Sequence, residues 1–132
     1  NSDMNIMKKI LVVDDAKTIR LIFQKTLAPF EEFKLECSND GSAAFKYLER
    51  AFADDIIFDL IISDWNMPFV SGIELLKRVK ADERFKSIPF IMLTAESASS
   101  NIAMAMKAGA IDFIAKPFSK NSVIEKIKKH AT

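Results

Sequence analysis

The sequence has one cysteine and one histidine among 132 residues, and its formal net charge is only +1. The single cysteine, Cys37, cannot form an internal disulfide, so a disulfide-stapled fold is excluded and a reducing cytoplasm is the expected location. With 19 basic and 18 acidic residues, the chain offers no electrostatic basis for binding nucleic acid or an anionic membrane. A signal-peptide pattern and a membrane-length apolar run are also absent, so we expect no membrane insertion.

Internal repeats, low-complexity tracts and Pro/Gly-rich linkers are missing too, which predicts one domain. An apolar content of 49% can build its core without disulfides or metal staples. We assign residues 8–132 to this domain, expected to be a monomer, and residues 1–7 to an N-terminal tail. Residues 1–3 precede the first methionine, where a cloning remnant would lie.

Short apolar runs alternate with helical patterns along the whole chain. This alternation predicts an α/β fold with a doubly wound parallel sheet of five strands and five flanking helices. The expected strands are residues 8–15, 33–38, 58–63, 90–94 and 111–115. The expected helices are residues 16–27, 42–50, 72–81, 98–108 and 121–130. In the first helix, the apolar side is expected to contain Ile19, Ile22, Phe23 and Leu27.

Polar side chains follow or end four of the five predicted strands. Asp14 and Asp15 end the first strand, Asp64 follows the third, Thr94 ends the fourth and Lys116 follows the fifth. Because the carboxyl ends of parallel strands meet at one edge of a sheet, we expect these side chains to form a site. Crowded carboxylates raise one another's pKa unless a cation lies among them. Oxygen ligands without His or Cys favour Mg²⁺ over zinc.

A hydroxyl and an amine beside such a metal suit the remaining oxygens of a phosphoryl group. The pattern therefore predicts a Mg²⁺ and phosphoryl site. Asp64 stands alone on the central strand, facing the acidic pair, and is the nucleophile candidate, since a carboxylate can form an acyl phosphate. Two plainer interpretations stay open: Asp14 and Asp15 as a turn and helix cap, and Lys116 as a solvated lysine.

Two rival functions use related folds. A haloacid-dehalogenase-type phosphatase also forms an aspartyl phosphate, but its nucleophile belongs in a D-x-D pattern after the first strand, where this chain has Asp14-Asp15-Ala16. A flavodoxin-like electron carrier needs a Ser/Thr-rich phosphate loop at that place, and two aspartates would repel a phosphate. Both patterns fit the sequence less well than the phosphoryl site does.

The segments LVVDD, SDWNMP, LTAE and KPF, in this order along the chain, resemble the receiver domain of two-component response regulators. The resemblance runs from about residue 8 to the C-terminus. SDWNMP followed by GIELLK is especially similar to the single-domain chemotaxis regulators. The resemblance implies a three-layer, flavodoxin-like sandwich with the strand order 2-1-3-4-5.

The resemblance also assigns roles to the site residues. Asp64 would be the phosphoacceptor that receives its group from the phosphohistidine of a histidine kinase. Asp15 and Asp64 would hold Mg²⁺ directly, together with the backbone carbonyl of Asn66. Asp14 would hold it largely through water. The chain would then be a switch that catalyses only its own phosphotransfer and autodephosphorylation.

Thr94 and Lys116 would bind phosphoryl oxygens, with a cis peptide between Lys116 and Pro117 that aims the lysine inward. On phosphorylation Thr94 would move toward the phosphoryl group, and Phe113 would fill the space it leaves. The surface that changes would be the fourth helix, fifth strand and fifth helix. Its expected contact residues are Ile102, Met106, Phe113 and Lys126. Glu96 and Asn66 match positions that set the lifetime of the phosphoform, and both predict a short one.

The expected partners are a sensor histidine kinase of the chemotaxis type, an output protein such as a flagellar switch component, and a phosphatase. Phe113 stands where the chemotaxis regulators have tyrosine, and residues 96–102 lack their lysines. Ser71 stands where the family commonly has an aspartate before Gly72. Residues 49–58, which lead into the third strand, form a longer connection than is usual in the family. A phosphorelay intermediate, or a receiver cut from a larger response regulator, therefore remains an alternative output.

Two plainer interpretations concern the last two helices. Ile102 and Met106 could be a buried stripe, although the resemblance places them outward, and Met104 with Ala108 makes a second stripe on roughly the opposite side. Lys126 is most simply one of several solvated lysines, and His130 is expected to be a frayed terminal residue.

Overall fold

A computed structural model of the chain describes residues 7–95 and 99–131, and within them five strands alternate with five helices. The strands are β1 (Lys8–Val13), β2 (Phe33–Ser38), β3 (Leu60–Asp64), β4 (Phe90–Ala95) and β5 (Asp112–Lys116). The helices are α1 (Lys17–Leu27), α2 (Gly41–Ala53), α3 (Gly72–Ala81), α4 (Ser99–Ala108) and α5 (Lys120–His130). Every expected element is present, and the ends differ by a few residues.

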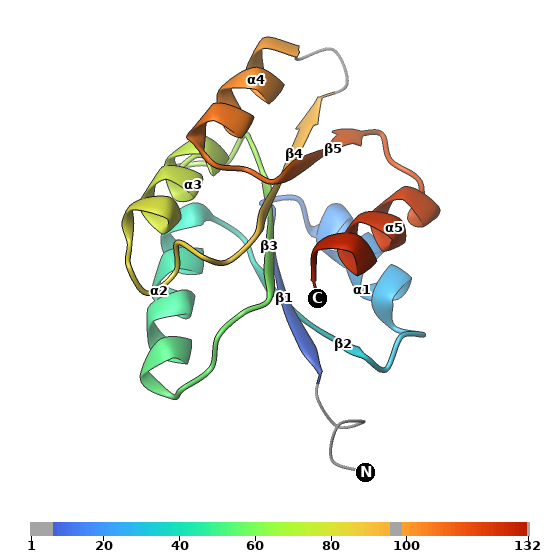
Figure 1. Ribbon diagram of the computed structural model, residues 1–132. Helices are drawn as coiled ribbons and strands as arrows, with labels where there is room; N and C mark the ends of the chain where they lie inside the picture. Colours follow the sequence, from blue (N-terminus) through green and yellow to red (C-terminus); the bar gives the residue numbers. More distant parts are fainter. Residues whose placement is uncertain (1–6, 96–98, 132) are drawn as a thin grey trace.

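All strand pairs are parallel, and the sheet order is β2-β1-β3-β4-β5. Helices α2, α3 and α4 cover one face of the sheet, and α1 and α5 cover the other (Figure 1). The predicted three-layer α/β fold and its strand order are therefore confirmed. Because the strands are parallel, all their carboxyl ends lie along the same edge of the sheet.

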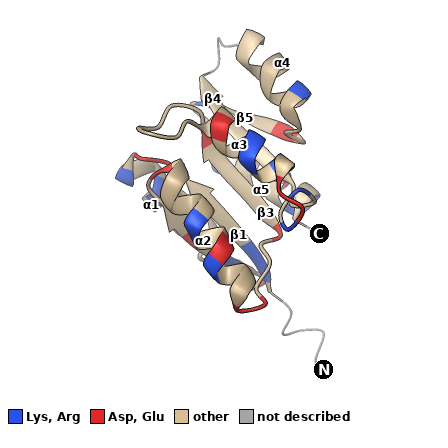
Figure 2. Ribbon diagram, turned by 90° about the vertical axis from the view of Figure 1, so that its left-hand side faces the viewer, with Lys and Arg blue, Asp and Glu red and all other residues tan. Residues whose placement is uncertain are grey.

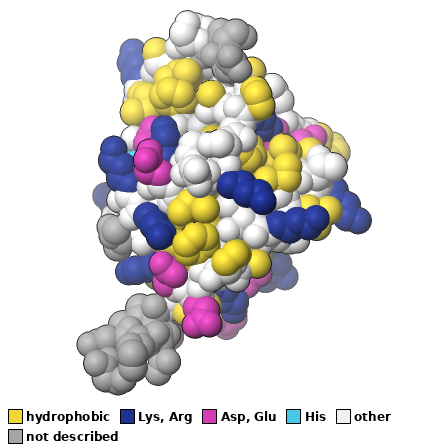
Figure 3. All heavy atoms as spheres, turned by 90° about the vertical axis from the view of Figure 1, so that its right-hand side faces the viewer, with side chains coloured by type: hydrophobic (Ala, Val, Ile, Leu, Met, Phe, Trp, Pro, Cys, Tyr) yellow, Lys and Arg dark blue, Asp and Glu magenta, His cyan; other side chains and the backbone are white. Residues whose placement is uncertain are grey.

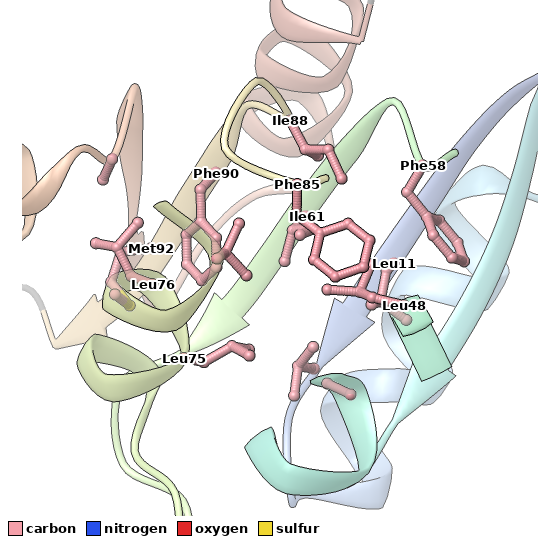
Figure 4. Close-up of a cluster of buried hydrophobic side chains, with 14 of the residues drawn as sticks. Leu11, Leu48, Phe58, Ile61, Leu75, Leu76, Phe85, Ile88, Phe90 and Met92 are labelled. Carbon is pink, nitrogen blue, oxygen red and sulfur yellow. The ribbon is translucent and has the colours of Figure 1, made fainter. Parts of the chain in front are cut away.

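The sheet separates two hydrophobic cores. Alternate residues of β1 divide between them, with Leu11 and Val13 in one core and Ile10 and Val12 in the other. The first core lies between the sheet and the layer that contains α2 and α3 (Figure 4). The second lies under α1 and α5. Burying each large apolar side chain stabilises the fold by about 1.5–3 kcal/mol, so both faces of the sheet hold the strand ends in place.

The outer helices bury fewer apolar residues than their sequences suggest. In α1, Phe23 and Leu27 are buried as expected, but Ile22 is 40% exposed, so its predicted inward position is wrong. In α4, Ala105 is the buried residue, and Met106 is exposed, as the resemblance implied. Met104 is exposed as well, because the helix contacts the sheet through its small residues.

Local capping fixes where several helices begin and end. The Asp40 carboxylate accepts a hydrogen bond from the backbone N–H of Ala43, so α2 begins at Gly41, one residue before the expected start. Ser71 and Glu74 form a capping box at the start of α3. Gly109 follows α4 with a φ of +115°, the left-handed conformation that a helix C-cap glycine adopts.

The surface carries charges of both signs without a single-sign field. Acidic and basic residues are interspersed along α2 and α3 (Figure 2). On the opposite face, basic residues lie between patches of hydrophobic side chains (Figure 3). Of the helices in the described ranges, none is both long and apolar enough to cross a membrane.

Candidate functional site

Three acidic residues meet at the carboxyl edge of the sheet. Asp14 follows β1 and Asp64 ends β3, and these strands are neighbours with Val13 opposite Ser63. Carboxylate oxygens of Asp14, Asp15 and Asp64 lie within 4.8 Å of one another. Asp14 is fully buried, Asp64 is 8% exposed and Asp15 is exposed. The structure thus brings together the three acids that the sequence placed at the ends of two different strands.

Lys116 reaches this cluster from the end of β5. Its Nζ donates to Asp64 Oδ1 at 2.9 Å and to Asp14 Oδ2 at 3.2 Å. The Lys116–Pro117 peptide is cis, as the resemblance implied. The alternative of a solvated lysine is therefore wrong. One ammonium group faces three carboxylates, so the cluster keeps an excess of negative charge.

Burial and the charges of neighbouring groups shift the pKa values of Asp14 and Lys116. Burial raises the pKa of Asp14, and repulsion from Asp64 adds to this, against the hydrogen bond from the Ala16 N–H and the attraction of Lys116. Burial alone would lower the pKa of Lys116, but its hydrogen bond to Asp64 and the attraction of both carboxylates outweigh this and raise it. Lys116 therefore stays charged, and the site favours the arrival of a further cation.

Backbone contacts fix the two buried acids. Asp14 Oδ1 accepts from the Ala16 N–H at 2.8 Å, and the Arg20 guanidinium donates to the Asp14 carbonyl at 2.7 Å. Asp64 Oδ1 accepts from the Trp65 N–H at 2.9 Å. The hydrogen bonds from the Ala16 and Trp65 N–H groups set the direction of each carboxylate before any ligand binds.

The start of α3 closes against the backbone of Asp64. A Cβ atom on Gly72 would lie 2.0 Å from the Asp64 carbonyl oxygen, which no side chain could tolerate. The Gly72 N–H also donates to the Trp65 carbonyl at 2.8 Å. This role of Gly72 went unrecognised in the sequence, where the residue marked only a helix start.

A pocket of about 220 Å³ opens beside Asp64. It is lined by Asp64, Trp65, Asn66, Thr94, Ala95, Asn101 and Lys116. Thr94 is buried on β4 and lines this pocket together with Lys116. Asn101 was not predicted, because its place in the pocket depends on how α4 packs and no sequence signal marks it.

The donor set fits a magnesium ion. The cluster Asp14, Asp15 and Asp64 is the only such group of potential metal ligands in residues 7–95 and 99–131. It offers carboxylate oxygens alone, carries excess negative charge and has one exposed member through which water can enter. Mg²⁺ prefers these ligands, whereas zinc prefers nitrogen and sulfur. Asn66, an expected backbone ligand, is exposed at the mouth of the adjoining pocket.

The predicted switch residue Phe113 lies in a charged network between β5 and α5. Lys126 Nζ donates to Asp112 Oδ1 at 2.9 Å and to the Phe113 carbonyl at 2.6 Å, and lies 4.9 Å from the centre of the Phe113 ring. His130 Nε2 lies 2.9 Å from Asp112 Oδ2. The interpretations of Lys126 as a solvated lysine and of His130 as frayed are therefore wrong. In both cases the partner is Asp112, which the sequence pattern did not mark.

The other predicted output and lifetime residues are scattered. Met106 is exposed on α4 and Ile102 is half-buried on the same helix. Phe113 is half-buried on β5. Glu96 lies outside the described residues.

Comparison with known proteins agrees with this geometry. The profile of the response regulator receiver domain matches residues 10–128. The chemotaxis protein CheY1 of Helicobacter pylori strain J99 is 40% identical over 120 residues, which cover 91% of this chain and 94% of that protein. The chemotaxis protein CheY of Pseudomonas aeruginosa is 39% identical over 121 residues, covering 92% of this chain and 94% of that protein.

Solved structures show the same fold. The chemotaxis protein CheY4 of Vibrio cholerae superposes with a TM-score of 0.81 at 32% identity, covering 94% of this chain and 98% of that one. The receiver domain of the sensor histidine kinase PA1611 of Pseudomonas aeruginosa, solved with a magnesium ion coordinated in its active-site cleft, has a TM-score of 0.81. It covers 95% of this chain and 98% of that one at 23% identity, and so supports the fold alone.

Proposed function

Since the chain belongs to the response regulator receiver domain family, and is similar to chemotaxis regulators over most of its length, we propose that it accepts a phosphoryl group on Asp64 from a histidine kinase. The observation that carries this proposal is the contact of Lys116 with both Asp64 and Asp14 in an otherwise acidic cluster. Such an arrangement positions the carboxylate of Asp64 as a nucleophile and places the positive charge of Lys116 where it can bind an incoming phosphoryl group. The family gives no support to the phosphatase and electron-carrier alternatives.

The hydrogen bonds of Asp64 select its attacking atom. Oδ1 accepts from both the Trp65 N–H and Lys116 Nζ, each at 2.9 Å. Within the described part of the chain, Oδ2 receives no hydrogen bond, so it is the oxygen that forms the new bond to phosphorus. The bond between phosphorus and the histidine nitrogen breaks, and the imidazole leaves.

Asp14, Asp15 and Asp64 would hold Mg²⁺, with the Asn66 carbonyl as a further ligand. When bound, Mg²⁺ neutralises the carboxylates and the phosphoryl oxygens, which lowers the repulsion between nucleophile and donor. Lys116 and the hydroxyl of Thr94 face the same pocket and take the remaining phosphoryl oxygens. The chain itself supplies positioning and charge, which is what phosphoryl transfer chiefly requires.

The phosphoryl group then biases the molecule between two forms. Thr94 moves toward the phosphoryl oxygen, and Phe113 turns into the space behind it. The surface of α4, β5 and α5 changes, and the residues expected to meet an output protein are Ile102, Met106, Phe113 and Lys126. The proposed partners are a chemotaxis-type histidine kinase, a flagellar switch component and a phosphatase. The proposed phosphoform is short-lived and cytoplasmic, and the chain acts as a monomer.

The test uses Trp65, the only tryptophan, which follows Asp64 directly. Its fluorescence is expected to change saturably with Mg²⁺, and again when beryllofluoride, a phosphoryl mimic, is added. The Asp64→Asn variant should lose the second change. Asp55→Asn is the matched control, because Asp55 is exposed at the opposite edge of the sheet, between α2 and β3.

Either result is informative. If Asp55→Asn behaves as wild type and Asp64→Asn does not respond to beryllofluoride, Asp64 is the acceptor. If wild type responds to neither ligand, the acids have a structural role and the phosphoacceptor proposal must be abandoned.

A further inference from the structure

Phe69 is the most exposed large hydrophobic residue in the described ranges, at 90% exposure. It lies in the loop between β3 and α3, where its neighbours behave differently: Met67 packs against the first core and Val70 is buried. A phenylalanine held almost wholly in water contributes nothing to the core. Its hydrophobic side chain is therefore available for contact with another molecule.

The backbone of Phe69 is also unfavourable for this residue. Its φ is +67°, in the left-handed region that glycine and asparagine adopt readily and bulky side chains do not. The Val70 N–H donates to the Pro68 carbonyl at 2.8 Å, which closes a tight γ-turn with Phe69 at its centre. Phe69 thus has no packing partner in the core, and its backbone conformation is strained.

Packing on both sides prevents the loop from relaxing. A Cβ atom on Gly41 would lie 2.8 Å from Val70, so the start of α2 is seated against the residue after Phe69. Further along, Gly72 closes against the Asp64 carbonyl. The contacts of Gly41 and Gly72 therefore force the backbone into this turn and keep Phe69 in its strained conformation. Strained backbone that is maintained by surrounding packing is typical of functional sites.

The position of the loop identifies the kind of partner. It begins directly after Asp64, and its residue Asn66 lines the pocket beside that nucleophile. The pocket, at about 220 Å³, suits a phosphoryl group rather than a protein. A protein that brings a phosphohistidine within bonding distance of Asp64 must rest on the loops around the pocket. An exposed aromatic in the loop that leaves this pocket is the kind of residue that anchors an interface.

We propose that Phe69 is a docking residue for the protein phosphodonor, the histidine-bearing domain of the kinase. This inference rests on the phosphoacceptor function of Asp64 proposed above. Phe69 takes no part in the chemistry. It contacts the donor protein and so raises the rate of transfer from that protein without changing the intrinsic reactivity of Asp64.

The experiment compares two donors that share a leaving group. One is the phosphorylated histidine domain of a chemotaxis kinase from Pseudomonas aeruginosa, whose regulator is 39% identical to this chain. The other is monophosphoimidazole, which presents the same reacting bond without a protein. The ratio of the two second-order rate constants measures the advantage that docking supplies. Thermal unfolding of each variant checks that it folds.

Phe69→Asn is expected to reduce this ratio by about tenfold or more, as for an interface anchor. Its rate with monophosphoimidazole should equal that of wild type, and its thermal midpoint should not fall, because asparagine tolerates the backbone. Phe69→Tyr should retain the ratio. Ile57→Asn, which removes another exposed hydrophobic at the opposite edge of the sheet, is the matched control and should also retain it.

Three results would overturn the inference: a ratio that Phe69→Asn leaves unchanged, an equal loss with both donors, or a wild-type ratio no greater than one. An unchanged ratio would mean that Phe69 contacts a different protein at this edge of the sheet, such as a phosphatase. Absence of labelling by monophosphoimidazole would instead refute the acceptor role of Asp64. The two proposals therefore fail in distinguishable ways.

Discussion

At the scale of single residues, Thr26 stands out on α1. Its side chain is buried, and its Oγ1 is the one buried side-chain polar atom in the described residues without a hydrogen-bond partner. Replacing such a hydroxyl by a methyl group of the same shape removes an uncompensated desolvation cost. We therefore expect Thr26→Val to raise the free energy of unfolding by about 1 kcal/mol, measured by urea denaturation.

Thr18→Val is the control for this change. Thr18 lies on the same helix and is exposed, so the substitution tests helix propensity without relieving burial. A loss in Thr26→Val alone would show that the buried hydroxyl has a partner in solution. A similar gain in both variants would assign the gain to helix propensity instead of the relief of burial.

The site residues divide clearly by what sequence can reveal about them. Asp14, Asp64 and Lys116 could be predicted, because a strand followed by a charged residue has only one edge of a parallel sheet on which to place it. Asn101 and Phe69 could not be predicted. Asn101 enters the pocket through the packing of α4, and the strain at Phe69 follows from contacts made by Gly41 and Gly72, which lie far apart in the chain.

At the scale of elements, Asp112 joins β5 to α5. Burial alone would raise its pKa, but the hydrogen bonds from Lys126, His130 and the Phe113 N–H outweigh this and lower it. A carboxyl with a lowered pKa stabilises the folded state above its unfolded pKa, near 3.8, and this contribution is lost as the pH falls through the folded value. The contact of Asp112 with α5 therefore stabilises the fold most at neutral pH, and this stabilisation is lost in acid.

Asp112→Asn should lower the free energy of unfolding at pH 7 by about 1–2 kcal/mol, because it leaves Lys126 without its charged partner. The difference between wild type and the variant should shrink as the pH falls below the unfolded pKa of 3.8 and through the lower folded pKa, where the wild-type carboxyl becomes protonated. Urea denaturation at pH 7 and pH 3 measures both values. A difference that does not change with pH would show that the carboxylate charge is not the stabilising feature.

The ends of the elements were harder to predict than their identity. Helix α2 was expected to stop at residue 50 but continues to Ala53, because Ala51 is buried in the first core. That burial depends on the fold of the whole layer and leaves no local signal. In α1, Ile22 fits the apolar periodicity together with Phe23 and Leu27, yet the helix is rotated so that Phe23 and Leu27 face the core and Ile22 does not.

At the scale of the whole molecule, the acidic cluster links stability to metal binding. A ligand that binds only the folded state raises the free energy of unfolding by about 2.7 kcal/mol at one hundred times its dissociation constant. At that concentration, Mg²⁺ should therefore raise the thermal midpoint of wild type by roughly 10 °C, because the unfolding entropy of a domain of this size is about 0.28 kcal/mol/K. EDTA should reverse the increase.

Asp15→Asn should lose most of this gain. Asp15 is the exposed member of the cluster, so the variant keeps its core intact. In EDTA it should be at least as stable as wild type, because one of three mutually repelling carboxylates is gone. Calorimetry measures the thermal midpoints. Equal increases of the midpoint with Mg²⁺ in wild type and Asp15→Asn would exclude Asp15 as a ligand.

The layers could be predicted from alternating strand and helix patterns, since these patterns fit only a parallel sheet covered on both faces. The order of the strands could not be derived in that way and came from the resemblance. The network of Asp112, Lys126 and His130 was also unpredictable, because it joins residues whose proximity depends on how α5 returns along β5.

That return of α5 has a practical consequence. His130 ends α5 beside Asp112, the first residue of β5, and Lys8 begins β1 at the same edge of the sheet (Figure 1). Both positions lie across the molecule from Asp64. A biosensor chip coupled near either of them would present the pocket and Phe69 to the flowing solution, so wild type and Phe69→Asn could be compared for kinase binding in the same orientation.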